Sequence, residues 1–474
     1  MLSFFVRMVL ARRLAIEDFG LFYAIIGFLA PIGPLKNLGF SRAITRFVPI
    51  FNKKGELQRI KEALNWGILL SLGTSAILLI PFFLLAGVIE EKFFHAPGAS
   101  GPFRIMLIYF VTGALAGVFT SFFHGLKKTV LISFHEVFIP LITLVLLLPL
   151  RTLDISILCS IRASAEGIAL SALIIIMLKT FPYIETKSSL TCDGFKLLLG
   201  FGLKAITSPL VNRVLGRLDI IILTYLQGLT QVGLYSAAQP FARLFMIFGS
   251  SIGKMMLPYS SEWSLSGGHD EPRRILASIQ RLTLFLLMPM AVLFFLLSEG
   301  LMDLFFGKIY EEGSMVVRIL VFGSLLHGLT IINTNVIIGS GHPLKITKMT
   351  IVSSLFNLAG NIILIPLYGM NGAALSTLIA YFLMFAVSSH YIKHLLNHSF
   401  DWLLIIKAAT SAFPMVLLFI ATMRFVTDDI WILLFVIFPL ALITYVLVSI
   451  LNGFVLKKEL ISIVQKKRLP AALS

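Results

Sequence analysis

The stretch IWILLFVIFPLALITYVLVSILN, residues 430–452, runs for 23 residues without a charged side chain. A helix needs about 20 apolar residues to cross the hydrocarbon core of a bilayer. Apolar runs of this kind recur along the whole chain, so the pattern predicts an all-α membrane protein with about fourteen transmembrane helices. The other runs lie near 1–14 (short), 20–40, 65–88, 103–124, 130–150, 156–178, 195–226, 232–259, 280–300, 316–339, 346–367, 371–392 and 403–424.

The overall composition excludes a soluble globular protein. Of the 474 residues, 58% are hydrophobic and 13% are charged, whereas soluble chains are about 45–50% apolar and about 25% charged. Residues 1–10 are apolar but too short for a full span, so we expect the end of a first helix and no cleavable signal peptide.

The distribution of Lys and Arg between alternate loops predicts the orientation in the membrane. One set of loops, together with the tail, carries 23 of these residues and the opposite set carries six. Because positive loops stay in the cytoplasm, we expect both termini on the cytoplasmic side of the cell membrane. All connections are short; the longest loop, residues 41–64, leaves no room for a catalytic domain. The basic, partly apolar tail 455–473 is typical of an interfacial helix on anionic headgroups.

Ten further cations fall within or at the edges of the predicted helices. A cation facing lipid at mid-bilayer costs at least about 2.5–3.5 kcal/mol, so several together need water, a partner or an anionic ligand. One interpretation is side chains that reach the headgroups, or ion pairs such as Arg162 with Glu166. The other is a basic cavity for an anion such as a phosphate, pyrophosphate, carboxylate or acidic sugar, which we favour for Arg213, Arg217 and Arg243. The ten are Arg7, Arg12, Arg13, Lys36, Arg162, Lys204, Arg213, Arg217, Arg243 and Lys254.

Three similarities in register indicate an internal repeat. GLFYA at residues 20–24 is echoed by GLYSA at 233–237, FVP at 47–49 by MLP at 256–258, and Gly125 by Gly341. The offset is close to six helices. An even number of helices per repeat predicts two parallel lobes with a substrate site between them.

Three motifs resemble the polysaccharide transporter family of oligosaccharide-lipid flippases, part of the multidrug/oligosaccharidyl-lipid/polysaccharide exporter superfamily. The first is ARRLAIEDFGLF at residues 11–22, similar to A-R-x-L-G-x-x-x-y-G-l-f except that Ala15 replaces the usual Gly. The second is LDIIILTYL at 218–226 followed by VGLYSAA at 232–238. The third is NLAGNIILIPLYGMNGAA at 357–374, in which we expect Asn357 and Asn361 to bond helix to helix and 366–372 to form an outer turn.

The resemblance implies a polyprenyl-(di)phosphate-linked oligosaccharide as substrate, moved to the outer leaflet by alternating access for cell-surface polysaccharide biosynthesis. It implies an N-terminal lobe over 1–182, a C-terminal lobe over 193–395, appended helices over 400–453 and a basic cytoplasmic tail over 454–474. By position, the resemblance assigns substrate binding to Arg12, Lys36, Arg217 and Arg243. We add Arg213, because it lies four residues before Arg217 and so shares a helix face with it. Asp219 would be an ion-pair partner or a proton or sodium coupling site. We expect a monomer in contact with membrane lipids.

Two alternatives remain, one from the same superfamily and one from a different class of protein. A cation-coupled multidrug exporter of the same superfamily would need an acidic cavity, whereas buried carboxylates are scarce here. A membrane-embedded glycosyltransferase or polymerase would need acidic or metal-binding motifs and a larger loop domain, and neither is seen. The sequence therefore predicts a protein that is not an enzyme, with no cofactor, no metal site and no nucleic-acid partner.

Overall fold

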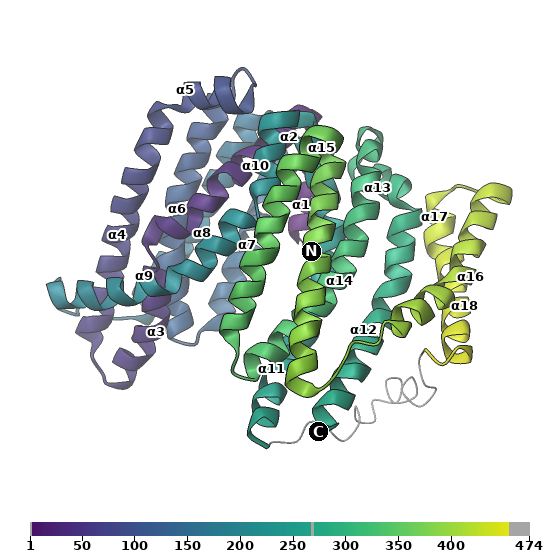
Figure 1. Ribbon diagram of the computed structural model, residues 1–474. Helices are drawn as coiled ribbons and strands as arrows, with labels where there is room; N and C mark the ends of the chain where they lie inside the picture. Colours follow the sequence, from purple (N-terminus) through teal and green to yellow (C-terminus); the bar gives the residue numbers. More distant parts are fainter. Residues whose placement is uncertain (1, 267–269, 455–474) are drawn as a thin grey trace. The chain divides into compact units, whose positions relative to one another are not determined.

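The computed structural model describes residues 2–266 and 270–454, and every element in these residues is a helix (Figure 1). The predicted interfacial helix over 455–473 lies outside the described residues. Ten helices of the described part are long and apolar enough to cross a membrane. The prediction of an all-helical protein with many membrane spans is confirmed, while the number fourteen stays a prediction.

The chain divides into two compact units, Met1–Gly233 and Leu234–Ser474, here called unit 1 and unit 2. The division falls within α11 (Leu229–Ser266), and the lobe boundaries expected from the sequence stay a prediction. Unit 1 holds α1 (Leu2–Arg13), α2 (Ile16–Leu29), η1 (Ala30–Asn37), α3 (Phe40–Lys53), α4 (Leu57–Leu84), α5 (Ala86–Ile89), η2 (Glu90–Phe94), α6 (Ser100–Gly125), α7 (Thr129–Leu147), α8 (Ile155–Thr180), α9 (Cys192–Leu215), α10 (Leu218–Gln227) and the start of α11.

The segment expected to be the longest loop is largely helical, which corrects the prediction for residues 41–64. α3 occupies Phe40–Lys53, and α4 already begins at Leu57. The buried residues Phe40, Ala43, Ile44, Val48 and Phe51 recur every three or four positions and form one apolar face. Such a face stabilises a helix even when the other side is basic, because it packs against a neighbour. α3 packs against α4, α6 and α9.

Small residues on α6 let α3 approach closely. Val48 of α3 lies against Gly125, where an added Cβ would come within 2.9 Å of the Val48 Cβ. The Ser41 hydroxyl donates to the Gly117 carbonyl at 3.3 Å, and the Thr45 hydroxyl donates to the Ser121 carbonyl at 3.4 Å. Close approach with hydrogen bonds to backbone carbonyls is a common way to join helices in a membrane.

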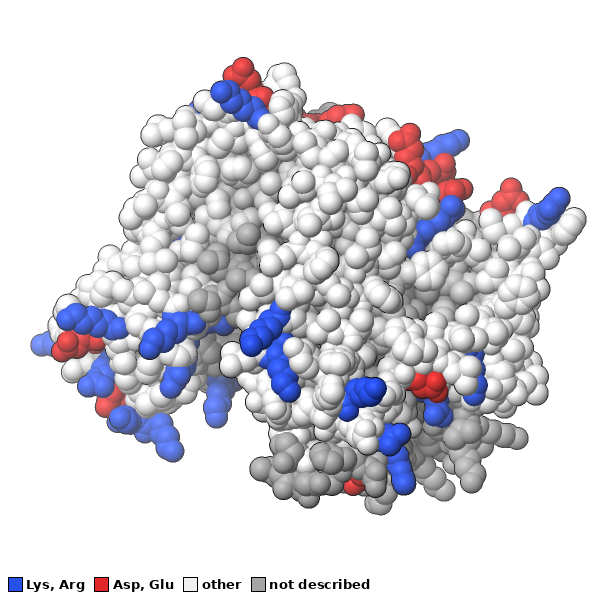
Figure 2. All heavy atoms as spheres, in the orientation of Figure 1, with Lys and Arg blue, Asp and Glu red and all other residues white. Residues whose placement is uncertain are grey.

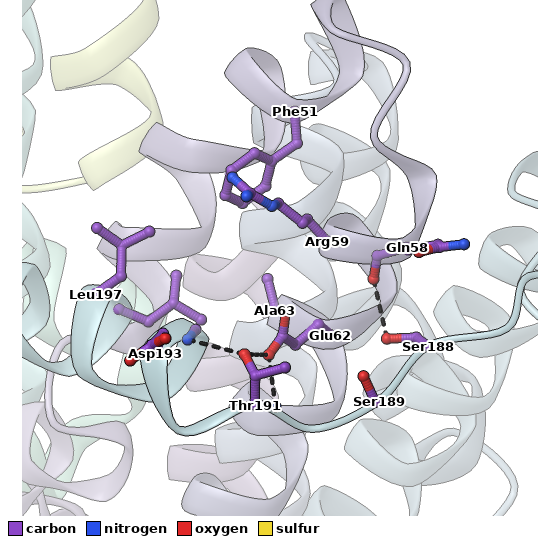
Figure 3. A pocket seen from close by; sticks show the side chains of 12 residues that line it. Phe51, Gln58, Arg59, Glu62, Ala63, Ser188, Ser189, Thr191, Asp193 and Leu197 are labelled. Atoms are coloured by element: carbon purple, nitrogen blue, oxygen red, sulfur yellow. Dashed lines mark hydrogen bonds between the residues drawn. The ribbon is translucent and has the colours of Figure 1, made fainter.

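The connection between α8 and α9 is bound along one face of α4. Lys61 donates to the carbonyls of Tyr183 at 2.8 Å and Thr186 at 2.9 Å. One helical turn further on, the Tyr183 hydroxyl donates to Asn65 Oδ1 at 2.5 Å. At the start of α9, the backbone N–H of Thr191 donates to Glu62 Oε1 at 2.8 Å (Figure 3). The N-terminal end of α9 is therefore held to α4.

Unit 2 holds the rest of α11, α12 (Asp270–Leu296), α13 (Ser298–Phe306), η3 (Lys308–Gly313), α14 (Ser314–Gly339), α15 (Pro343–Leu396), α16 (Leu403–Phe425), α17 (Ile430–Ile432), η4 (Leu433–Ile437) and α18 (Phe438–Leu451). α14 packs against α15, and α12 packs against α14 and α16. Buried amides join three of these segments: Gln280 Nε2 donates to Asn333 Oδ1 at 2.8 Å, and Asn333 Nδ2 donates to Ser388 Oγ at 3.2 Å. Satisfied polar groups of this kind hold helices together in lipid.

α15 is bent where the sequence predicts a turn. Gly369 has φ 55° and ψ −133°, a backbone conformation that breaks the helix and that residues with a side chain rarely adopt. The two arms of α15 are joined by Asn357, whose Nδ2 donates to Ser376 Oγ at 3.3 Å. Asn361 in turn donates to Asn357 Oδ1 at 3.1 Å. The predicted helix-to-helix bonding is confirmed for Asn357, and the break at Gly369 lies within the predicted turn.

Charge is distributed unevenly over unit 1. Figure 2 shows Lys and Arg gathered at the end of unit 1 formed by α3 and the starts of α4 and α9, next to a broad surface without charge. α4 also carries exposed apolar side chains, such as Ile77, Ile80 and Leu84. An uncharged band of this kind is typical of a surface that faces lipid.

Candidate functional site

A cavity of about 550 Å³ in unit 1 brings together three of the predicted substrate-binding residues. It is formed by α2, η1, α6 and the junction between α9 and α10, and we call it the basic cavity. Its cations are Lys36, Arg213 and Arg217, and its remaining wall is largely apolar and aromatic, with Tyr109 and Phe110 from α6. A set of cations within apolar walls favours an anionic ligand, because attraction between charges is strong where water is scarce.

The position of Lys36 follows from the two prolines of η1. Pro31 and Pro34 lack a backbone N–H, so α2 cannot continue as a regular α-helix and gives way to a 3₁₀ helix. Leu38 and Gly39 then have φ 45° and 80° and turn the chain into α3. The Thr74 hydroxyl donates to the Lys36 carbonyl and ties η1 to α4. The Lys36 ammonium lies 5.2 Å from the centre of the Phe110 ring, within range of a cation–π contact.

Arg213 and Arg217 enter the cavity from the break between two helices. α9 ends at Leu215, and Arg217 precedes α10 with φ −135° and ψ 2°. Arg213 Nη1 lies 3.6 Å from the position that a Cβ on Gly33 would occupy, so Gly33 leaves room for this guanidinium beside η1. Lys36 and Arg213 are close enough to repel each other electrostatically. An anion between them would relieve this repulsion.

A buried carboxylate lies beside the basic cavity. Glu166 of α8 is 5% exposed, and it interacts electrostatically with Arg162 and Lys36. The spacing of Arg162 and Glu166 correctly indicated that these two residues are neighbours. The proximity of Glu166 to Lys36 was missed, because it depends on how η1, α6 and α8 pack and has no signal in local sequence. Arg162 itself lies over the Tyr109 ring, with its Cζ 5.4 Å from the ring centre.

The other predicted residues do not line the basic cavity. Arg12 is exposed at the end of α1, and Arg13 next to it donates to the carbonyls of Leu147 at 2.8 Å and Leu150 at 3.1 Å. Asp219 is half-buried in the first turn of α10, where its Oδ1 accepts the backbone N–H of Ile220 at 2.8 Å. Arg243 is exposed on α11 in unit 2.

A second pocket in unit 1, of about 420 Å³, lies at the start of α4 and α9 (Figure 3). Its lining carries both signs of charge, with Arg59, Glu62 and Asp193. Glu62 already accepts two hydrogen bonds from Thr191, one from the backbone N–H and one from the hydroxyl. This carboxylate is thus bonded within the protein, and we interpret the pocket as part of the attachment of α9 to α4.

The family model described as "Polysaccharide biosynthesis protein" matches residues 9–315. This range is more than half of the chain and contains the basic cavity. The chain belongs to the polysaccharide biosynthesis protein family. The resemblance drawn from the three motifs is thereby confirmed.

Two relatives extend the comparison to single proteins. An uncharacterized membrane protein of Methanocaldococcus jannaschii is 24% identical over 425 residues, which are 85% of this chain and 84% of that protein. The "Probable low-salt glycan biosynthesis flippase Agl15" of Haloferax volcanii is 21% identical over 221 residues, which are 46% of this chain and 47% of Agl15.

Among solved structures, this member of the polysaccharide biosynthesis protein family is similar to "Lipid II flippase MurJ, inward closed conformation". The TM-score is 0.77 and the identity is 16%, and the similarity covers 97% of each chain. At this identity the likeness shows a shared fold, which is therefore the MurJ-like fold.

Proposed function

We propose that this protein is a flippase or exporter of lipid-linked sugars. It would move a polyprenyl-(di)phosphate-linked oligosaccharide across the cytoplasmic membrane by alternating access, for cell-surface polysaccharide biosynthesis. The observation that carries the proposal is the basic cavity, in which Lys36, Arg213 and Arg217 meet among apolar and aromatic side chains. The phosphate groups of the substrate would bind these cations, and the polyprenyl chain would stay in lipid.

The family and the names of similar proteins support the same class of substrate. The matching family is one of polysaccharide biosynthesis. Agl15 is described as a probable glycan biosynthesis flippase, and MurJ as a lipid II flippase. Both names refer to a flippase, and that of Agl15 also to glycan biosynthesis. A basic cavity suits the phosphate group by which a sugar is linked to a polyprenyl lipid.

The finer parts of the proposal come from the sequence. They are fourteen transmembrane helices in two parallel six-helix lobes with two further helices appended, both termini in the cytoplasm, and a monomer. Arg12 and Arg243 are retained as further substrate contacts, and Asp219 as an ion-pair partner or as a site of proton or sodium coupling. A membrane transporter with these parts needs no enzymatic step.

The alternative of a cation-coupled multidrug exporter is less well supported. A cationic drug would meet three cations in the basic cavity, and like charges brought together out of water repel strongly. Binding of a cationic dye with no binding of prenyl phosphates would favour this alternative.

The test is a flipping assay with purified protein in proteoliposomes. The probe is a fluorescent short-chain polyprenyl diphosphate that carries one sugar, and its exposure to a membrane-impermeant reductant reports movement between leaflets. We expect Lys36→Gln, Arg213→Gln and Arg217→Gln each to lower the rate at low probe concentration by about tenfold or more, because each removes a charged contact to phosphate.

The matched control is Arg104→Gln, the same chemical change on α6 at a residue outside the basic cavity that donates to the Phe83 carbonyl at 3.4 Å. It should flip the probe at the wild-type rate. A triple variant at Lys36, Arg213 and Arg217 that flips as fast as the wild type would refute the proposal.

A further inference from the structure

Glu166 and Lys36 meet at the side-chain space that Gly113 leaves open. A Cβ on Gly113 would lie 3.5 Å from Glu166 Oε1 and 3.5 Å from Lys36 Nζ, so these two atoms are at most about 7 Å apart. Gly113 and Lys36 line the basic cavity, and the Glu166 carboxylate lies next to both. Lys36, which would bind the phosphate of the substrate, therefore already has the carboxylate of Glu166 as a neighbour.

Glu166 also has a histidine neighbour to which it can turn. His135 of α7 places Nε2 3.8 Å from Glu166 Oε1, and this nitrogen is buried without a hydrogen-bond partner among the described residues. Arg162, one turn before Glu166 on α8, interacts with it electrostatically. The carboxylate thus lies among groups from α7, α8 and η1, with Lys36 on the side of the cavity.

A phosphate and Glu166 would compete for the same ammonium. A buried carboxylate needs a cation or hydrogen bonds to offset its loss of hydration, and so does a phosphate drawn into an apolar cavity. When the phosphate binds Lys36, Glu166 loses part of its compensation, so the phosphate and the carboxylate oppose each other at this one ammonium. A transporter benefits from such opposition, because a substrate that is bound too tightly in the cavity is not released.

We propose that Glu166 is the resident counter-anion of Lys36, which the substrate's phosphate displaces on binding and which drives the phosphate out again on release. His135 receives the displaced carboxylate by donating its Nε2–H to it. This inference rests on the proposed function and assigns Glu166 as a positioning residue, since it acts on the substrate through Lys36. It goes beyond a general basic cavity because it makes release depend on one named carboxylate.

The test compares binding with turnover in Glu166→Gln, which keeps the shape of the side chain and removes its charge. Binding is measured on the purified full chain in detergent with a fluorescent short-chain prenyl diphosphate, and turnover by the flipping assay at saturating probe. We expect binding about tenfold tighter, because Glu166 no longer competes with the phosphate for Lys36, and a maximal rate lower by about tenfold, because the carboxylate that displaces the phosphate from Lys36 is gone. Glu166→Asp should restore both values toward those of the wild type.

A structural role would give a different result, since a distorted cavity binds more weakly and flips more slowly. Weaker or unchanged binding by Glu166→Gln would therefore overturn the inference. A second measurement tests the inference if that variant folds poorly: in a Lys36→Gln background, the further change Glu166→Gln should no longer tighten binding.

Failure of the wild type to bind any prenyl diphosphate would instead overturn the proposed function. Glu91→Gln, at an exposed carboxylate of η2 away from the basic cavity, is the control and should change neither value.

Discussion

At the scale of one residue, Gly113 shows that the basic cavity depends on a position without a side chain. Its hydrogen side chain leaves the space in which the ammonium of Lys36 and the carboxylate of Glu166 face each other. A side chain that projects into this space would separate the two charges and occupy part of the room that a phosphate needs. Because Gly113 lies in the middle of α6, its conformation does not require glycine, so the position tests space alone.

Substitutions at Gly113 should therefore depend on size. Gly113→Ala places a methyl group at 3.5 Å from both charged atoms, an ordinary contact distance, and we expect nearly wild-type binding of the prenyl diphosphate probe. Gly113→Leu fills the space with apolar atoms next to two charges and should weaken binding by about tenfold or more. Fluorescence titration in detergent measures the effect.

The matched control on the same helix is Gly101→Leu, because a Cβ on Gly101 would meet no atom within 4 Å. It should bind the probe like the wild type. Equal binding by Gly113→Leu and Gly101→Leu would show that the space beside Lys36 is not used by the anion.

At the scale of elements, α9 begins with a helix cap that two helices share. The Thr191 hydroxyl accepts the backbone N–H of Gly194 at 3.0 Å, as the first residue of a capping box does. In a capping box the third helical residue is Glu or Gln and accepts the N–H of the capping residue. Here the third helical residue is Gly194, which has no side chain to accept a hydrogen bond. Glu62 of α4 accepts the Thr191 N–H instead. A Cβ on Gly194 would collide with the Glu62 carboxylate, so glycine is required for the shared cap.

The shared cap predicts that Glu62 and Gly194 matter for stability. Glu62→Ala leaves the half-buried hydrogen bond of the Thr191 N–H without its acceptor, which should cost about 0.5–1.5 kcal/mol. Gly194→Ala should destabilise the protein as well, because the new methyl group displaces the carboxylate. Thermal unfolding of purified protein in detergent, followed by tryptophan fluorescence, should show a lower melting temperature for both variants.

Glu185→Ala is the control for this experiment, since Glu185 is an exposed carboxylate of the same connection. Its melting temperature should equal that of the wild type. If Glu62→Ala melted together with this control, α9 would be held by its other contacts and the cap would contribute nothing measurable.

At the scale of the whole molecule, the two cysteines offer a direct test of the predicted orientation. The chain has only Cys159 and Cys192; Cys159 is buried in α8, and Cys192 is exposed at the start of α9. The Lys and Arg distribution predicts that the start of α9 faces the cytoplasm. A membrane-impermeant maleimide should therefore label the protein in inverted membrane vesicles and leave it unlabelled on intact cells.

Two cysteine variants assign the label to one residue. Cys159→Ser should keep the labelling of inverted vesicles, and Cys192→Ser should abolish it. Labelling of Cys192 on intact cells would mean that the orientation derived from the loops is reversed.

The sequence by itself determined the properties that depend on local composition. The apolar runs predicted the helices, since about 20 apolar residues suffice to cross a bilayer wherever they occur. The bend at Gly369 was predictable from the Pro366–Gly372 segment, and the basic character of the site from the excess of Lys and Arg. α3 was missed although its apolar residues from Phe40 to Phe51 recur at helical spacing, because its charges were attributed to a loop.

Only the tertiary structure decided which charges share a cavity. Lys36, Glu166 and Arg213 lie on η1, α8 and α9, far apart in the sequence, and they become neighbours because Gly33 and Gly113 let those segments approach. The same packing leaves Arg12 and Asp219 outside the basic cavity, although motif position favoured them equally. Local sequence specifies the sign of a charge and the helix that carries it, whereas distance between charges follows from how helices pack, and electrostatic interaction depends on that distance.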